Sequence, residues 1–189
     1  LVLDLSDRIG WLAGLVLADL GADVIKVEAP EAEVGGADWQ AYNVNKRLLR
    51  LDPDSIDGSS VFDELVASAD VLIESSQSAG RWARCVDSDR LRQCNPRLVH
   101  VSVTPFGHEG PRADWVASDI ELMAAGGAMA LAGEPDGAPT RVTVPQSWCW
   151  AGAQAAVGAL TALVHRTVSG AGQRVDVSAQ AAVMLALSH

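Results

Sequence analysis

Short apolar runs alternate with longer segments of helical periodicity along most of the chain. The apolar runs have the length of strands and are bounded by glycine, proline or charged residues. They predict strands at Leu1–Leu5, Ala22–Val27, Arg47–Leu51, Val71–Ile73 and Leu98–Val103. Apolar residues at helical spacing predict helices at Ile9–Leu20, Ser59–Ala69 and Ser88–Cys94. Strands that alternate with helices favour an α/β fold, a Rossmann-like parallel sheet with helical crossovers.

The last third of the chain is predicted to be mainly helical. Helical patterning covers Ser118–Ala130 and Gln146–Val168, and Val175–Ser178 leads into a final helix that reaches His189. The second of these helices is apolar for nearly the length of a membrane span. It is rich in alanine and glycine, however, and we interpret it as a buried, tightly packed helix. The final helix ends with the chain and carries no capping signal. We therefore expect residues 1–189 to form one domain, the N-terminal portion of a longer protein.

The composition is that of an acidic globular protein. Hydrophobic residues make up 49% of the chain and charged residues 20%, and the formal net charge is −10. A nucleic-acid-binding protein normally shows a basic face, so we expect no nucleic-acid partner, and we expect no membrane partner either. The three cysteines fit neither a zinc site nor a CxxC pair and favour reduced thiols in a cytoplasmic protein. The four histidines are scattered and predict no metal site.

Two common nucleotide-binding motifs are missing from the sequence. Gly10 and Gly14 do not make a GxGxxG motif, and no acidic residue follows at the expected place. This argues against a nicotinamide dehydrogenase. There is also no Walker A motif, which argues against a P-loop nucleotidase.

A set of short motifs in a fixed order carries a family resemblance. The set comprises Asp4–Ser6, Leu17–Glu28 (LADLGADVIKVE), Asn43–Arg47 (NVNKR) with Leu51-Asp52, Ala69–Glu74, Asn95–Val99, Phe106-Gly107 with Gly110-Pro111, Gly133–Gly137 (GEPDG), Gln146–Arg166 and Gly172–Ser178 (GQRVDVS). Each motif is weak alone, but the ordered set covers nearly the whole chain. The chain thereby resembles the class III CoA-transferases of the CaiB/BaiF type, which include formyl-CoA transferase and carnitine CoA-transferase.

The resemblance implies a fold and a binding site. The fold would be the large, Rossmann-like domain of a class III CoA-transferase, with coenzyme A at the carboxyl ends of the strands. Coenzyme A or acyl-CoA would be a substrate, there would be no prosthetic group, and a carboxylic acid would be the second substrate. Two chains would associate as a homodimer, or as a heterodimer with a related subunit. The CoA-binding residues implied are Arg8, Ile9, Tyr42, Asn43, Val44, Asn45, Lys46, Arg47, Ser75, Ser76, Arg84, Thr104, Pro105, Phe106 and Gly107, of which Tyr42–Asn45 match a loop.

The catalytic residue implied by the resemblance is replaced in this chain. The family attacks the acyl-CoA thioester with an aspartate, and that position is Trp148 here. No aspartate or glutamate occurs between Asp136 and Asp176, so a shifted alignment does not supply one. We interpret Cys149 as an inert helical thiol, and the catalytic residues stay unknown. The leading hypothesis is a CoA-transferase family protein that transfers CoA between an acyl-CoA and a carboxylic acid. The alternatives are a non-catalytic subunit paired with an Asp-bearing homologue, and a CoA-thioester enzyme that uses groups from a C-terminal part.

Overall fold

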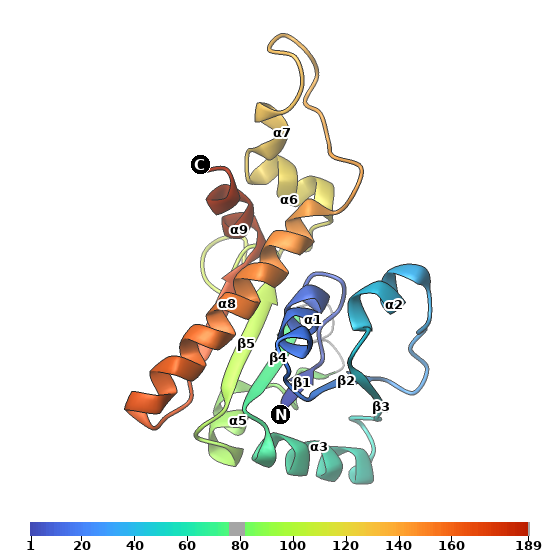
Figure 1. The fold of residues 1–189 in the computed structure, drawn as a ribbon, viewed down its shortest axis with the longest axis vertical. Coiled ribbons are helices and arrows are strands. Elements are labelled where there is room, and N and C mark those ends of the chain that lie inside the picture. The colour runs from blue at the N-terminus through green and yellow to red at the C-terminus, as the bar shows by residue number, and fades with distance from the viewer. Residues whose placement is uncertain (76–81, 189) are drawn as a thin grey trace.

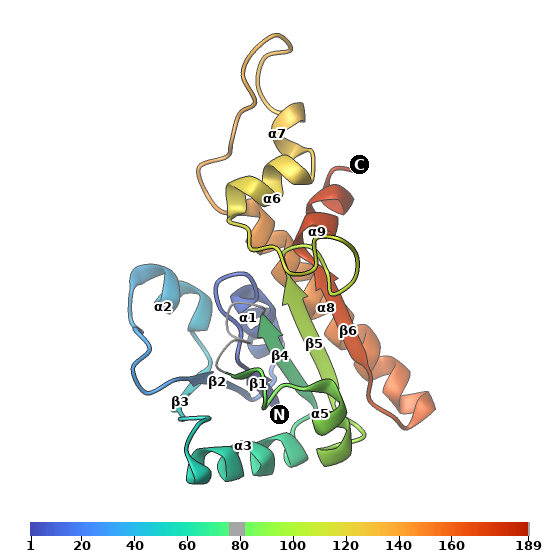
Figure 2. The ribbon, with the colours of Figure 1, turned by 180° about the vertical axis from the view of Figure 1, so that it is seen from behind.

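The computed structural model describes residues 1–75 and 82–188. Its centre is an all-parallel sheet with the strand order β3-β2-β1-β4-β5-β6 (Figures 1 and 2). The strands are β1 (Val2–Asp4), β2 (Val24–Glu28), β3 (Arg47–Arg50), β4 (Val71–Ser75), β5 (Val99–Thr104) and β6 (Arg174–Ser178). The helices are α1 (Trp11–Asp19), α2 (Ala37–Asn43), α3 (Ile56–Ser68), α5 (Ser88–Cys94), α6 (Asp119–Ala125), α7 (Ala128–Leu131), α8 (Gln146–Ser169) and α9 (Ala179–Ala186).

The predicted order of strands and crossover helices is confirmed. β2, β1, β4 and β5 are neighbours and run parallel, and Val2 pairs with both Val24 and Val71. β4 runs two residues beyond its predicted end, because Glu74 and Ser75 still pair with β5. This is the Rossmann-like α/β fold that the alternating pattern predicts.

Three predictions need correction. The final helix, expected to reach His189, is α9 and ends at Ala186. Tyr42 and Asn43 do not lie in a loop, because they form the last turn of α2, which begins after Gly36. The predicted helix Ser118–Ala130 is broken into α6 and α7 at Gly126-Gly127. Gly127 has a φ of +89°, a left-handed conformation that ends the first helix and that glycine adopts without strain.

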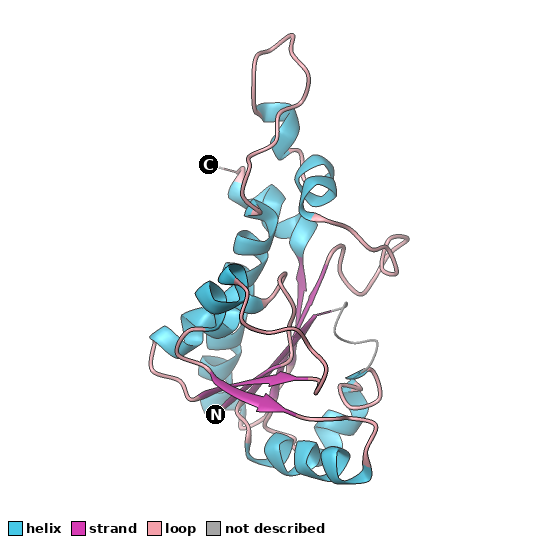
Figure 3. Cartoon of the chain, turned by 90° about the vertical axis from the view of Figure 1, so that its right-hand side faces the viewer, coloured by secondary structure: helices cyan, strands magenta, loops and turns pink. Residues whose placement is uncertain are grey.

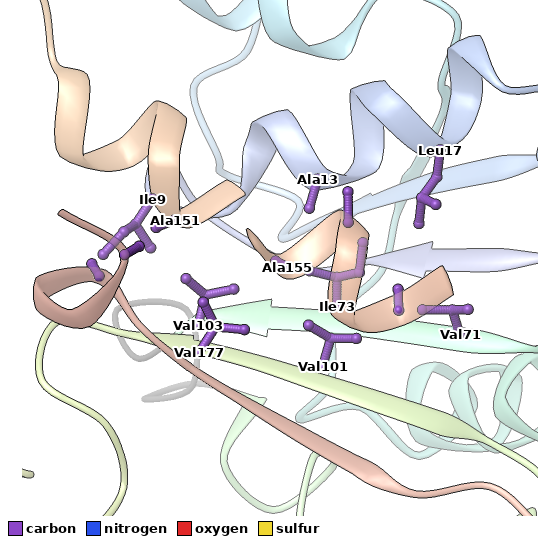
Figure 4. Packing of buried hydrophobic residues seen from close by; sticks show 14 of the residues in the cluster. Ile9, Ala13, Leu17, Val71, Ile73, Val101, Val103, Ala151, Ala155 and Val177 are labelled. Carbon is purple, nitrogen blue, oxygen red and sulfur yellow. The ribbon is translucent and has the colours of Figure 1, made fainter. Parts of the chain in front are cut away.

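Two cores cover the two faces of the sheet, and the apolar residues of β1, β2 and β4 alternate between them. On one face, α1 and α8 pack their alanines and Leu17 against valines of β4 and β5 (Figure 4). On the other face, Phe62 of α3 and Leu91 of α5 pack against Leu3 and Leu72. Gly152 brings α8 close to α1, since a Cβ there would lie 2.7 Å from the Cβ of Leu12. The two cores fix the positions of the strand ends.

The long helix α8 is partly buried. It is long and apolar enough to span a membrane, but its inner face packs against α1, β5 and β6. Its outer face leaves Val157, Val164 and Val168 exposed. The predicted burial therefore holds for one face of the helix. Beyond the sheet, α6, α7 and the following loop project as an arm that returns to the start of α8 (Figures 1 and 3).

Candidate functional site

A small cavity lies where α2 faces the first turn of α8. It has a volume of about 150 Å³, and we call it the Trp148 cavity. Its lining residues are Arg8, Trp11, Leu12, Asp38, Tyr42, Val144, Pro145, Trp148 and Cys149. Three aromatic side chains therefore wall a space whose charged groups are one arginine and one aspartate. The Tyr42 hydroxyl lies 3.6 Å from the Cys149 sulfur, and this hydrogen bond together with burial raises the pKa of Tyr42.

A larger cavity of about 770 Å³ adjoins the first at the carboxyl ends of β1, β2 and β3. Its lining residues are Asp7, Arg8, Trp11, Ala32, Glu33, Val34, Gly36, Asp38, Trp39 and Arg50. Arg8, Trp11 and Asp38 belong to both cavities and join them. Arg50 donates hydrogen bonds from Nη1 to the carbonyl oxygens of Ala29, Pro30 and Ala32 and so holds the loop after β2. The volume is within the range of protein sites for small molecules and cofactors.

The sequence prediction missed several residues of this region, among them Asp7, Trp11, Asp38, Trp39 and Arg50. A usable signal existed for Asp7 and Arg50. Both follow or end predicted strands, and ligands bind at the carboxyl ends of parallel strands. The two tryptophans carried no such signal, since they reach the cavity through α1 and the unpredicted α2.

Arg8 stands between the two cavities. Its guanidinium lies 3.8 Å from an oxygen of Asp38 and 5.9 Å from the centre of the Trp11 ring. Its side chain is about half exposed, so it reaches the solvent at the junction. An exposed guanidinium on an aromatic wall is suited to binding a carboxylate or phosphate.

The buried carboxylate of Asp119 is bonded to the residue before Trp148 but does not line the Trp148 cavity. Asp119 of α6 accepts two hydrogen bonds from Ser147, from the backbone nitrogen at 3.0 Å and from the hydroxyl at 2.7 Å. Both residues are buried, and neither lines the Trp148 cavity. Asp119 therefore fastens the first turn of α8 to α6. Trp148, the third residue of α8, turns its ring to the cavity and to the core around Ala151.

Lys46 is buried under the site rather than presented to it. Its ammonium donates to Asp4 Oδ2 at 2.7 Å and to Trp11 O and Asn43 Oδ1, each at 2.9 Å, and its side chain has no exposed surface. Burial opposes ionisation of Asp4, but Lys46 and Lys26 outweigh it and hold the pKa of Asp4 below its ordinary value. All three N–H groups of Lys46 are thus used within the protein. This network ties β1, α1 and α2 together.

The rest of the predicted Tyr42–Arg47 segment spreads away from the cavities. Val44 is exposed, and Asn45, with a φ of +66°, donates a hydrogen bond to Asp19. Arg47 begins β3 at the amino edge of the sheet, where it pairs with Asp23. The structure therefore brings Arg8 and Tyr42 together, and it separates Arg47 from them.

The remaining predicted residues lie at other points of the carboxyl edge. Ser75 accepts a hydrogen bond from the backbone of Asp7, whose carboxylate in turn accepts one from Ile9 N. At the end of β5, Thr104 Oγ1 accepts one from Gly107 N, Pro105 O accepts one from Gln180 N, and the Phe106 ring packs edge-on against Trp115. Arg84 is exposed, pairs with Asp54 and lines neither cavity. Ser76 lies outside the described residues. Their roles in CoA binding stay predictions.

The described residues form two joined cavities and no candidate metal centre. Within residues 1–75 and 82–188, no cluster of three His, Cys, Asp or Glu side chains could hold a metal. The two joined cavities instead offer a wide polar space, an arginine at the junction and a narrow aromatic end. The aromatic end is lined by the Cys149 thiol and the Trp148 indole, and its one carboxylate among the described residues is that of Asp38.

Comparison with known proteins shows one family throughout. The family model for CoA-transferase family III matches residues 1–189. The chain is 34% identical over 187 residues to a succinate–glutarate CoA-transferase of Agrobacterium fabrum. The aligned region covers 89% of this chain and 47% of the relative. It is also 34% identical over 203 residues to the BbsE subunit of the succinyl-CoA:(R)-benzylsuccinate CoA-transferase of Thauera aromatica. This alignment covers 100% of this chain and 50% of the relative.

A solved structure agrees with these relatives. A CAIB/BAIF family protein from Brucella suis has a TM-score of 0.88 and 32% identity, with 99% of this chain and 54% of that chain covered. The chain thus spans about half the length of the curated relatives it matches. The match extends over the whole sequence and includes the fold. The chain therefore belongs to CoA-transferase family III.

Proposed function

We propose that this chain is the CoA-binding domain of a cytoplasmic protein that transfers CoA between an acyl-CoA and a carboxylic acid, and that it lacks a nucleophile of its own. The observation that carries the proposal is Trp148. An indole stands at the position of the family's nucleophile and lines the Trp148 cavity. Residues 146–150 contain no carboxylate. The substrates follow from the family, and the loss of the nucleophile follows from this residue.

The joined cavities support a specific binding mode. The nucleotide part of CoA would occupy the larger cavity, where Arg8 can pair with phosphate and the Trp39 indole offers an aromatic face. The thioester would reach the Trp148 cavity through the junction at Arg8. Lys46 would support the site without contacting the ligand, because its hydrogen bonds to α1 and α2 hold in place the helices that carry Trp11 and Tyr42.

The family reaction explains why residue 148 matters. A carboxylate attacks the thioester carbonyl, the CoA thiolate leaves, and a mixed anhydride is formed on the enzyme. An indole has no group that can accept the acyl in this way. We therefore expect this domain alone to bind acyl-CoA with little or no transfer, since loss of a covalent nucleophile costs several orders of magnitude in rate.

A second candidate is a non-catalytic subunit that pairs with an Asp-bearing homologue. The comparison with BbsE favours it, because that relative is itself named as a subunit of a CoA-transferase. In this form the present chain would contribute architecture and CoA binding, and the partner chain would contribute the carboxylate. A homodimer is the corresponding assembly for the first candidate.

One experiment separates the candidates. The full-length protein is incubated with labelled acyl-CoA and a panel of carboxylic acids, with and without an Asp-bearing paralogue, and hydroxylamine is added to trap acyl groups. We expect acyl-CoA binding without a hydroxamate on residues 146–150. Exchange that appears with the paralogue supports the subunit, whereas rapid exchange by the protein alone supports a complete enzyme with a nucleophile elsewhere.

Two results would contradict the inactive domain. An acyl adduct on Cys149 would establish thiol catalysis, and absence of acyl-CoA binding would remove the proposed function altogether. The substitution Trp148→Asp serves as a further check. We expect it to leave activity well below that of an Asp-bearing relative, because the neighbours of the ring have packed around an indole.

A further inference from the structure

A third cavity lies at the opposite edge of the sheet from the CoA site. It has a volume of about 400 Å³ and sits beside α5, where β5 and β6 begin. The residues that matter here are Ser88 and Arg92 of α5, His100 of β5, and Gln173 and Arg174 at the start of β6. None of them lines the two cavities described above.

The charge of this cavity is opposite to that of the whole chain. The chain has a net charge of −10, yet Arg92 and Arg174 line the cavity and no aspartate or glutamate does. Neither arginine has a hydrogen bond or ion pair with a described residue, whereas Arg47, Arg90 and Arg166 all pair with carboxylates. Two unpaired guanidinium groups in one concave space attract anions.

A buried histidine belongs to the lining of the cavity. His100 is only 6% exposed, and its Nδ1 lies 3.4 Å from the hydroxyl of Ser88. Its Nε2 has no hydrogen-bond partner among the described residues, and the nearest carboxylate, Glu74, is 3.5 Å away. A buried ring nitrogen without a hydrogen bond is unusual, because most buried polar groups in proteins are hydrogen-bonded.

We propose that this cavity is an anion site, distinct from the CoA site, that binds a small doubly charged oxyanion. Guanidinium groups bind carboxylate and phosphate oxygens through paired hydrogen bonds, and two arginines match two negative charges. The volume suits a small metabolite. A dicarboxylate and a phosphate ester share this chemistry, and the experiment distinguishes them.

The test measures stabilisation of the full-length protein by inorganic phosphate and by succinate. Thermal unfolding is followed at increasing concentrations of each anion, with KCl at matched ionic strength as the reference for screening. We expect at least one of the two anions to raise the melting temperature beyond KCl, because a ligand that binds the native state stabilises it. The anion with the greater effect identifies the preferred oxyanion.

Two double variants locate the binding. In Arg92→Gln/Arg174→Gln we expect the apparent Kd for that anion to rise by about tenfold or more, the scale of losing hydrogen bonds to charged groups. Arg112→Gln/Arg141→Gln removes the same charge from exposed loops and should retain wild-type binding. The melting temperature without anion shows whether each variant is folded.

Saturation with CoA completes the test, and it should leave the anion effect unchanged. The proposal is overturned if neither anion stabilises beyond KCl, or if the Arg92→Gln/Arg174→Gln variant binds as well as the wild type. It is equally overturned if CoA abolishes the effect, because the anion then occupies the CoA site.

Discussion

At the scale of single residues, burial separates side chains that look equivalent in the sequence. Lys46 and Arg47 are adjacent basic residues in one motif, but Lys46 is buried in a network and Arg47 is 64% exposed beside Asp23. A buried charge depends on its partners, whereas an exposed pair is worth little because water already stabilises both ions. Neighbours in one motif therefore have different roles.

The Lys46→Met substitution tests this difference. It leaves the buried Asp4 carboxylate with a weaker set of partners, and we expect the free energy of unfolding to fall by about 3–5 kcal/mol. Arg47→Met is the matched control, with an expected loss of about 1 kcal/mol or less. Urea denaturation measures both. Equal losses in the two variants would contradict the buried network.

Acid unfolding tests the same network from the side of Asp4. The pKa of Asp4 is lowered from 3.8: burial acts to raise it, but Lys46 and Lys26 prevail. A carboxyl group with a lowered folded pKa contributes stability above its unfolded pKa and loses it as the pH falls through the folded pKa. We expect the free energy of unfolding to decline below pH 3.8. Denaturation curves of Asp4→Asn should show a weaker decline in this window. An identical acid profile would mean that Asp4 does not titrate as described.

Binding gives a second contrast between arginines. Arg8 stands at the junction of the two cavities, and Arg47 lies at the other edge of the sheet. We expect Arg8→Gln to weaken CoA binding by about 1.5–3 kcal/mol, the scale for a hydrogen bond to a charged group. Arg47→Gln should leave it unchanged. Calorimetric titration with CoA compares them, and a loss confined to Arg47→Gln would move the site to the amino edge.

At the scale of elements, the close contact between α1 and α8 holds the Trp148 cavity in place. α8 begins at the cavity, and α1 provides Trp11 and Leu12 as its opposite wall. Gly152 allows the two helices to approach, because a side chain there would meet the Cβ of Leu12 at 2.7 Å and the backbone nitrogen of Ala13 at 3.2 Å. The contact therefore couples packing to the shape of the site.

The substitution Gly152→Val tests that contact. We expect it to destabilise the protein by about 1–3 kcal/mol, because the added methyl groups have no space between the helices. Ala153→Val places the same side chain on the exposed neighbouring position of α8 and should cost less. Thermal unfolding of the two variants is compared. Equal melting temperatures would show that the helices are less closely packed than the structure indicates.

The elements also show what the sequence could and could not predict. The inner strands were predictable because short β-branched and aliphatic runs such as Val71–Ile73, bounded by polar residues, are typical of buried strands in a globular chain. The helix α2 was missed because it is short, polar and stabilised by tertiary contacts such as the bond from Trp39 to Glu28. The candidate site was predictable in outline from the motifs. The burial of Lys46 was not, since a basic residue after Asn45 reads as solvated until α1 and α2 are placed above it.

At the scale of the whole molecule, charge is unevenly distributed. With a net charge of −10, the acidic side chains repel one another in the folded state. The cavity beside α5 instead brings two arginines together at one edge of the sheet. The proposed CoA site at the other edge mixes both signs. The two edges of one sheet therefore present different electrostatic surfaces to anionic ligands.

The net charge predicts a response to salt. Screening reduces the repulsion among exposed carboxylates, so we expect the melting temperature to rise modestly when KCl is increased from low to physiological ionic strength. The buried contact between Asp4 and Lys46 is little affected by screening, so the cost of Lys46→Met should stay nearly constant over the same range. Thermal unfolding at several KCl concentrations measures both effects. A falling melting temperature would show that attractive exposed pairs outweigh the net repulsion.

The hydrogen bonds from Ser147 to Asp119 bear on how such a domain can evolve. They hold the start of α8 through residue 147, so the backbone there does not depend on the identity of residue 148. On the proposed function, a gene copy that has lost a catalytic carboxylate at that position would still encode a folded domain with its cavities in place. Selection can then retain the copy for binding or assembly after its chemistry has been lost, and position 148 becomes free to drift toward a residue as large as tryptophan.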